Sequence, residues 1–141
     1  MVALYLLDTN TVSYIVKGNN PTVDRHLAEM RISRITISSV TEGELRYGIA
    51  RKPEASRLRT IVDSFLQHVT ILPWDSKAAQ EYGNLRAALE QEGLSMGNLD
   101  TMIAAHALAV KAVMVTSDRA FSRIKRLKIE DWSRRSSVAS E

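Results

Sequence analysis

Cysteine is absent from the 141 residues of the chain, and histidine occurs only three times. The lack of cysteine excludes a disulfide scaffold, thiolate zinc sites, iron–sulfur clusters and a cysteine nucleophile. His26, His68 and His106 are widely spaced along the chain, which disfavours a histidine-rich metal site. Any catalysis must therefore depend on other side chains.

Long apolar runs and nucleotide-binding loops are missing as well. No apolar run approaches the ~18 residues that are needed to cross a bilayer. The apolar opening, which ends at Asp8, lacks the basic leader and the cleavage site of a signal peptide. We therefore expect a cytoplasmic protein without membrane association. GxGxxG, Walker and serine-elbow motifs are also absent, so dinucleotide binding, P-loop chemistry and acyl hydrolysis find no support.

The composition is that of one globular domain, with 45% hydrophobic and 25% charged residues. We expect this domain to span residues 1–132. Residues 133–141 are rich in serine and arginine, and we expect them to form a disordered tail. The formal net charge of +3 is compatible with a polyanionic partner.

Strand-like and helix-like segments alternate along the chain. Short apolar or β-branched runs at residues 3–7, 34–37, 69–72, 112–115 and 127–129 predict four to five short strands. Helical patterns lie between them, and this alternation predicts an α/β fold of three layers, with a mainly parallel sheet and helices on both faces. Ligands of such sheets bind outside the carboxyl ends of the strands.

Four acidic residues are expected at that edge. Asp8 directly follows the first predicted strand, and Asp118 lies shortly after the fourth. Glu44 and Asp100 lie near the starts of two predicted helices. Each also has a purely structural interpretation, because an aspartate after a strand often caps a helix and an acid in a first turn favours the helix dipole. Together they predict one acidic cleft.

Two glutamates, Glu42 and Glu44, lie near the start of the helix expected after residues 34–37, and either could supply the acid of the cleft. Ser39 and Glu42 have the spacing of a capping box, in which each side chain bonds to the other's backbone amide. Residues two apart on a helix lie about 200° apart, so Glu42 and Glu44 cannot face the same site. We therefore expect Glu44 to face the cleft. Asn98 is expected to cap the helix over residues 99–110.

An acidic cleft of this kind needs a cation. Two carboxylates ~4 Å apart repel by about 4 kcal/mol at an effective dielectric constant of 20. Ligands that are all oxygen select hard ions, Mg²⁺ or Mn²⁺, which suit phosphodiester hydrolysis. Three polar neighbours are expected to orient the acids through hydrogen bonds, namely Asn10, Thr116 and Ser117.

The segments that carry the acids are distinctive in their order and spacing. They are Leu-Leu-Asp8-Thr-Asn10, Glu42-Gly-Glu44-Leu-Arg-Tyr-Gly48, Asn98-Leu-Asp100-Thr-Met-Ile-Ala-Ala-His106 and Val115-Thr-Ser-Asp118-Arg-Ala-Phe121. In this order they resemble the motifs of PIN-domain ribonucleases, and most closely those of VapC-type toxins from bacterial toxin–antitoxin pairs. The resemblance extends over nearly the whole chain, through Trp132.

This resemblance implies a specific activity. It implies an endoribonuclease that depends on Mg²⁺ or Mn²⁺ and uses Asp8, Glu44, Asp100 and Asp118 as an acidic quartet. It also implies a structured RNA substrate such as a tRNA, a homodimer, and a VapB-type antitoxin whose chain enters the cleft and holds the toxin inactive.

Basic residues near the predicted cleft are candidates for contacts with the RNA backbone. They are Arg46, Arg51, Arg119, Arg123, Lys125 and Arg126. The alternative for this set is an ordinary solvated surface.

Two other functions remain open at this point. A phosphohydrolase of the HAD type would use Asp8 as its nucleophile, but it expects a second aspartate where this chain has Asn10. A non-catalytic regulatory module would use the acids to bind a metal ion without turning over RNA.

Overall fold

The computed structural model describes residues 3–134, so the part of the expected tail that follows Arg134 lies outside the described residues. Strands and helices alternate as predicted. In chain order they are β1 (Tyr5–Leu7), α1 (Thr9–Lys17), α2 (Pro21–Glu29), η1 (Ile32–Arg34), β2 (Ile35–Ser38), α3 (Ser39–Ala50), α4 (Ser56–His68), β3 (Thr70–Leu72), α5 (Ser76–Gln91), α6 (Asn98–Val110), β4 (Val113–Val115), η2 (Arg119–Arg123) and β5 (Ile129–Glu130).

The five strands form one sheet in the order β3-β2-β1-β4-β5, and every pairing in it is parallel. Strand β1 lies at the centre, where Tyr5 pairs with Ile35 of β2 and with Val113 of β4. The predicted α/β class with a parallel sheet of short strands is confirmed. Since β2, β1 and β4 are neighbours with the same direction, their carboxyl ends meet at one edge.

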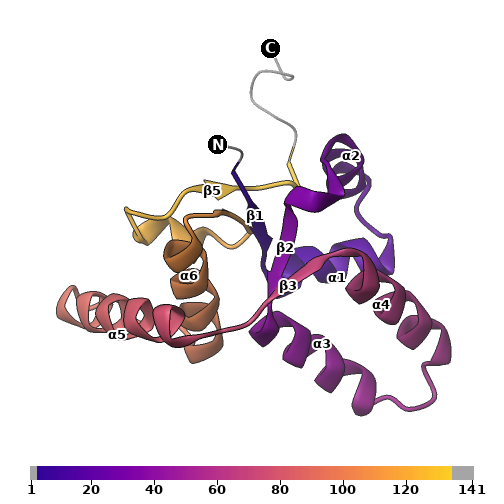
Figure 1. The fold of residues 1–141 in the computed structure, drawn as a ribbon, viewed down its shortest axis with the longest axis horizontal. Helices are drawn as coiled ribbons and strands as arrows, with labels where there is room; N and C mark the ends of the chain where they lie inside the picture. The colour runs from indigo at the N-terminus through magenta and orange to yellow at the C-terminus, as the bar shows by residue number, and fades with distance from the viewer. Residues whose placement is uncertain (1–2, 135–141) are drawn as a thin grey trace.

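Helices cover both faces of this sheet, with α5 and α6 on one side and α1, α2 and α4 on the other (Figure 1). Neighbouring strand residues point to opposite faces because the side-chain period of a strand is two. Leu7 and Val115 belong to the core with α1, α2 and α4, whereas Leu6 and Met114 belong to the core with α5 and α6. Burial on both faces explains why these strands are continuous apolar runs.

Helix ends agree with the sequence at some positions and differ at others. Gly18 ends α1 in the left-handed conformation with φ of 61°, and Asp75 caps α5 through the amide of Ala78, as glycine and aspartate commonly do at these positions. The predicted capping box is wrong, because β2 continues through Ser38 and it is the hydroxyl of Ser38 that caps α3. The predicted cap at Asn98 is also wrong, since Asn98 is already helical and follows an extended Gly97.

No helix within residues 3–134 combines the length and the apolar character that a membrane crossing requires.

Candidate active site

The carboxyl edge of the sheet brings the four predicted acids together from separate elements. Asp8 directly follows β1, and Asp118 lies shortly after β4. Glu44 lies in the second turn of α3, which leaves directly from the end of β2. Asp100 lies in the first turn of α6. The adjacency of β2, β1 and β4, together with the start of α6, places these acids near one another at this edge of the sheet.

Asp8 is the most enclosed of the four, with only 5% of its surface exposed. Its Oδ1 accepts a hydrogen bond of 2.8 Å from the amide of Thr11 and so caps α1. Burial raises the pKa of Asp8, hydrogen bonds from Thr116 and Thr11 oppose this, and the charge of Asp118 adds to it. Asp8 can therefore both cap α1 and serve in the site, because the cap uses Oδ1 and does not need Oδ2.

The pKa of Asp100 is affected by the charges of the other three acids. Its residue is largely exposed, yet partial desolvation of the carboxyl group raises its pKa. The negative charges of Asp118, Glu44 and Asp8 raise this pKa further, in that order. All three other acids are therefore close enough to act on Asp100.

Glu44 is half-buried, and its Oε1 accepts a hydrogen bond of 2.5 Å from the hydroxyl of Thr9. That hydroxyl also lies 3.3 Å from the hydroxyl of Thr41. Glu42 instead lies 3.9 Å from Arg46 on the outer side of α3. The helix phase expected for the two glutamates therefore agrees with the structure, although the capping box from which it was argued does not exist.

Asp118 is exposed and caps the short helix η2, with its Oδ1 accepting from the amide of Ala120 at 2.9 Å. Its own amide donates to the buried hydroxyl of Thr116 at 3.0 Å. The Thr116 hydroxyl thus contacts the backbone of Asp118 and acts on the pKa of Asp8, and its orienting role stays a prediction. Ser117 is half-buried between them, and its role stays a prediction.

The role predicted for Asn10 in orienting Asp8 stays a prediction, and the contacts that the structure shows to Glu44 and Asp8 are made by the neighbouring threonines. Asn10 is exposed on α1, whereas the carboxylate of Asp8 accepts from the amide of Thr11 and its pKa is lowered by the neighbouring hydroxyl of Thr116. Thr9 and Thr11 were missed. Their position in the sequence could have indicated them. Thr9 and Thr11 directly follow the first buried strand and Asp8, so they lie at the same edge of the sheet as Asp8.

The described residues do not form a ready-made cage for a metal ion, since no three acidic or histidine side chains within residues 3–134 surround a single point. The donor set still fits Mg²⁺. This ion keeps several of its waters and is usually bound by one or two carboxylates together with substrate phosphates. The mutual repulsion that raises the pKa of Asp100 is what such a cation would relieve.

A groove continues from the acidic cleft along α3. It encloses a cavity of about 720 Å³ whose walls are mostly apolar and include Glu44 and Leu99 near the acids. Tyr47 lies further along it and is 65% exposed, with the Arg51 guanidinium 5.5 Å from its ring centre. Lys17 lies in the same lining, so the groove is apolar with cations at the end away from the acids.

The predicted basic contacts fall into two groups. Arg46 is 3.0 Å from Asp63, and Arg126 is 3.2 Å from Glu81, so an acidic partner already neutralises each of them. The remaining four are exposed, with Arg51 at the end of α3 and the others on or just after η2. These four are Arg51, Arg119, Arg123 and Lys125, and the contact of all six with RNA stays a prediction.

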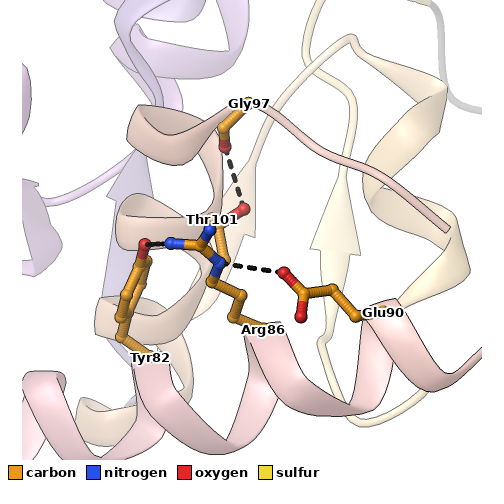
Figure 2. Close-up of polar contacts among 5 residues, drawn as sticks. All are labelled: Tyr82, Arg86, Glu90, Gly97 and Thr101. Atoms are coloured by element: carbon orange, nitrogen blue, oxygen red, sulfur yellow. Dashed lines mark hydrogen bonds and ion pairs between the residues drawn. The ribbon is translucent and has the colours of Figure 1, made fainter.

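The first turn of α6 is held in place by its own polar contacts. The amide and the hydroxyl of Thr101 both donate to the carbonyl of Gly97, at 2.9 and 2.8 Å (Figure 2). On the adjacent helix α5, Arg86 donates to the hydroxyl of Tyr82 and to Glu90 (Figure 2). The contacts between Thr101 and Gly97 fix the backbone at the start of α6, and Asp100, which directly precedes Thr101, extends from this fixed turn.

Comparison with protein families and with known proteins agrees with this geometry. The PIN domain family matches residues 5–127. A tRNA(fMet)-specific endonuclease VapC from Salmonella typhimurium is 38% identical over 129 residues, which are 91% of this chain and 97% of that protein. Ribonuclease VapC2 from Rickettsia felis is 35% identical over 133 residues, covering 93% and 99% of the two chains.

Solved structures show the same architecture. The DNA-bound VapBC complex from Salmonella typhimurium contains a chain that matches with a TM-score of 0.86 at 36% identity, over 93% of this chain and 99% of that one. The VapBC2 complex from Rickettsia felis, bound to a DNA fragment from its promoter, gives a TM-score of 0.85 at 34% identity, over 92% and 98%.

Proposed function

Because the chain belongs to the PIN-domain family, and within it to the VapC ribonucleases, we propose that its acidic cleft cleaves RNA with the help of Mg²⁺ or Mn²⁺. The observation that carries this proposal is the convergence of four acids from four segments at the carboxyl edge of the sheet, where burial, and then the charges of Asp118, Glu44 and Asp8, raise the pKa of Asp100. Four carboxylates from four segments act on one another there. Such a cluster suits the binding of a cation and, through it, of a phosphate group.

The roles of the four acids follow from their surroundings. Asp8 and Asp100, whose charged forms are disfavoured without a cation, would hold the ion, with Asp118 and Glu44 adjoining it. Such an ion neutralises charge on the phosphate and lowers the pKa of bound water. Thr9 occupies Oε1 of Glu44, so Oε2 is the oxygen that would accept a proton from the attacking water. Thr116 would orient Asp8 and hold the backbone at Asp118.

We propose a structured RNA as the substrate, and initiator tRNA is the first one to test, because two relatives are tRNA(fMet)-specific endonucleases. A cleft with several negative charges repels phosphate, so the RNA must be held by cations outside it. Arg119, Arg123 and Lys125 are exposed on the segment that follows Asp118 and suit this role. A cytoplasmic location is part of the same proposal.

We propose that an antitoxin segment occupies the groove along α3. The similar solved structures are VapBC complexes, and the groove is apolar along most of its wall and opens at Glu44. A bound segment there would reach the acidic cleft and block RNA. A homodimer is part of the same proposal, and the mass of the purified chain in solution tests it.

The deciding experiment incubates the purified chain with total RNA and with an initiator tRNA transcript, in Mg²⁺, in Mn²⁺ and in chelator, and maps the cut ends. We expect cleavage only with metal ions, and none by an Asp8→Asn variant, in which asparagine preserves the helix cap. Metal binding without RNA turnover would favour the regulatory module. A trapped phosphoaspartate at Asp8 would favour the phosphohydrolase.

Cellular expression provides an independent test. Expressed alone, the chain should arrest growth, and the Asp8→Asn variant should not. Growth arrest by both proteins would mean that the toxicity does not depend on the nuclease site.

A further inference from the structure

Two consecutive serines form the junction between β2 and α3, and each contacts a different part of the molecule. The hydroxyl of Ser38 accepts from the amide of Val40 at 3.1 Å and so caps α3. The same oxygen lies 2.8 Å from Nδ1 of His106 on α6. Ser38 and His106 are 0% and 1% exposed, so this contact is shielded from water.

The second serine makes an indirect connection to the same helix. The hydroxyl of Ser39 accepts from the backbone amide of Trp74, at 3.0 Å. The indole Nε1 of Trp74 donates to the carbonyl of Met102 on α6, at 2.9 Å. The ring of Tyr82 on α5 packs edge-on against this indole at 5.9 Å between centres. The start of α3 is therefore connected to α6 by two side-chain bridges.

Both bridges join the two helices that carry Glu44 and Asp100. Glu44 follows the serine pair by little more than one turn of α3, and Asp100 precedes His106 by less than two turns of α6. Adjacent helices exchange no ladder of backbone hydrogen bonds, so the spacing of α3 and α6 depends on side chains. The bridges therefore bear directly on the separation of Glu44 and Asp100.

The chemistry of the Ser38–His106 contact is that of a specific pair. Ser38 uses its oxygen to accept from Val40, and its proton can be donated to an unprotonated Nδ1. Burial lowers the pKa of His106, which favours the neutral ring, and in the tautomer with its proton on Nε2 the Nδ1 atom accepts from the Ser38 hydroxyl. A buried polar pair adds little net stability over two apolar groups of the same shape. Its advantage is a single defined geometry.

We propose that His106 is a positioning residue for RNA cleavage, which acts through Ser38, together with the bridge from Trp74, to hold Glu44 at its working distance from Asp100. This inference rests on the proposed ribonuclease function. It assigns to the histidine no contact with RNA, metal ion or water. Its effect on the reaction passes through the two helices.

The test compares two substitutions at His106 with a matched control on β2. Leucine in His106→Leu removes the contact with Ser38, whereas asparagine in His106→Asn places a polar atom near the position of Nδ1. Thr36→Val removes another buried hydrogen bond of the same strand, from the Thr36 hydroxyl to the carbonyl of Tyr5, at its far end. All three proteins are compared at a temperature at which circular dichroism shows them folded.

With an initiator tRNA transcript and Mn²⁺, we expect His106→Leu to lower kcat by about 10- to 100-fold, as losses of orienting contacts commonly do at metal sites. KM should stay within about twofold, because the RNA contacts lie elsewhere. His106→Asn should recover most of kcat, and Thr36→Val should leave it unchanged. Trp74→Phe, which removes the bond to Met102 and part of the ring contact with Tyr82, should have a smaller effect in the same direction.

A double variant shows whether the effect passes through Glu44. In a Glu44→Gln background, His106→Leu should cost much less than it does alone, since the residue being positioned is already disabled. Fully additive losses would overturn the proposal. So would an unchanged kcat in His106→Leu, or an equal loss of kcat in Thr36→Val.

Binding of Mn²⁺ alone separates this inference from the proposed function. By calorimetry without RNA, His106→Leu should bind Mn²⁺ about tenfold more weakly than wild type, and Thr36→Val should bind it normally. If wild type binds Mn²⁺ but cleaves no RNA, the ribonuclease proposal fails and this comparison still decides whether His106 positions the acids. Equal affinities in all three proteins would refute the positioning role.

Discussion

The two helices that flank the cleft, α3 and α6, each contribute one acid but are held in place by different forces. Helix α6 buries seven of its thirteen residues, four of them alanines, against the sheet and α5. Helix α3 buries three of twelve and exposes Tyr47 along the groove. Close packing thus fixes α6 along its length. Helix α3 depends more on the polar contacts of Ser38, Ser39 and Glu44 near its start.

This difference predicts different consequences of substitution. Side chains in a packed helix resist changes of volume, so substitutions in the core of α6 should act on stability. Hydrogen bonds at the start of α3 fix the distance and the orientation of the groups that they join. Their loss should therefore change the positions of the acids. The two sides of one site should therefore respond to mutation in distinguishable ways.

The largest effect is expected at the acid of the packed helix. Asp100→Asn should lower the cleavage rate by about 10³-fold, the upper range for removing one electrostatic group from an active site. Without metal ions its melting temperature should not fall, because the substitution removes repulsion from Asp118, Glu44 and Asp8. Single-turnover cleavage and thermal melting in chelator measure the two outcomes. Wild-type cleavage by this variant would eliminate the acidic quartet.

The acid of the less buried helix should show a smaller but selective effect. Glu44→Gln should lower the cleavage rate by about 10²-fold, while Glu42→Gln, on the outer side near Arg46, should stay within about twofold of wild type. Both substitutions remove one negative charge, so Glu42→Gln is the matched control. The reverse order of the two rates would mean that α3 presents its other side to the cleft.

A third test contrasts the packing of the two helices. Ala105 of α6 is fully buried, and Ala105→Leu should lower the free energy of unfolding by about 1–3 kcal/mol through overpacking. Ala50 of α3 is exposed, and Ala50→Leu should change it by no more than about 0.5 kcal/mol. Urea denaturation measures both values. Equal effects at the two positions would contradict the described difference in packing.

The smallest effect concerns pH. The pKa values of Asp8 and Asp100 are raised above the ordinary 3.8, so in metal-free protein their contribution to stability is fully present below 3.8 and is lost as the pH rises through the raised values. Relative to Asp100→Asn, wild type in chelator should therefore lose stability between pH 3.8 and neutrality. Denaturation of both proteins across this range is the measurement. A constant difference between them would mean that the pKa of Asp100 is not raised on folding.

Much of the fold could be predicted because its signals are local. Buried parallel strands are continuous apolar runs, and Leu7, Ile37 and Val115 lie in runs that were recognised as strands. The four acids could be selected because a parallel sheet brings its carboxyl ends together, and the charges acting on Asp100 agree with this choice. Their catalytic roles remain predictions.

The partners of these acids could not be predicted in the same way. Thr9 contacts Glu44 across 35 positions of sequence, and Ser38 contacts His106 across 68. Local patterns carry no information about such pairs. The cap of α3 was misplaced for a related reason, because the length of β2 is set by its pairing with β1 and β3 and not by its own residues.

The sequence by itself determined the class of the fold, the order of strands and helices, and which acids follow the strands, because strand and helix periodicity and turn chemistry act over a few residues. Only the tertiary structure decided that Thr9 orients Glu44, that Asp63 and Glu81 neutralise Arg46 and Arg126, and that Ser38 meets His106. Hydrogen bonds and ion pairs of this kind depend on atomic distances between segments, and those distances exist only after the sheet has brought its strands together.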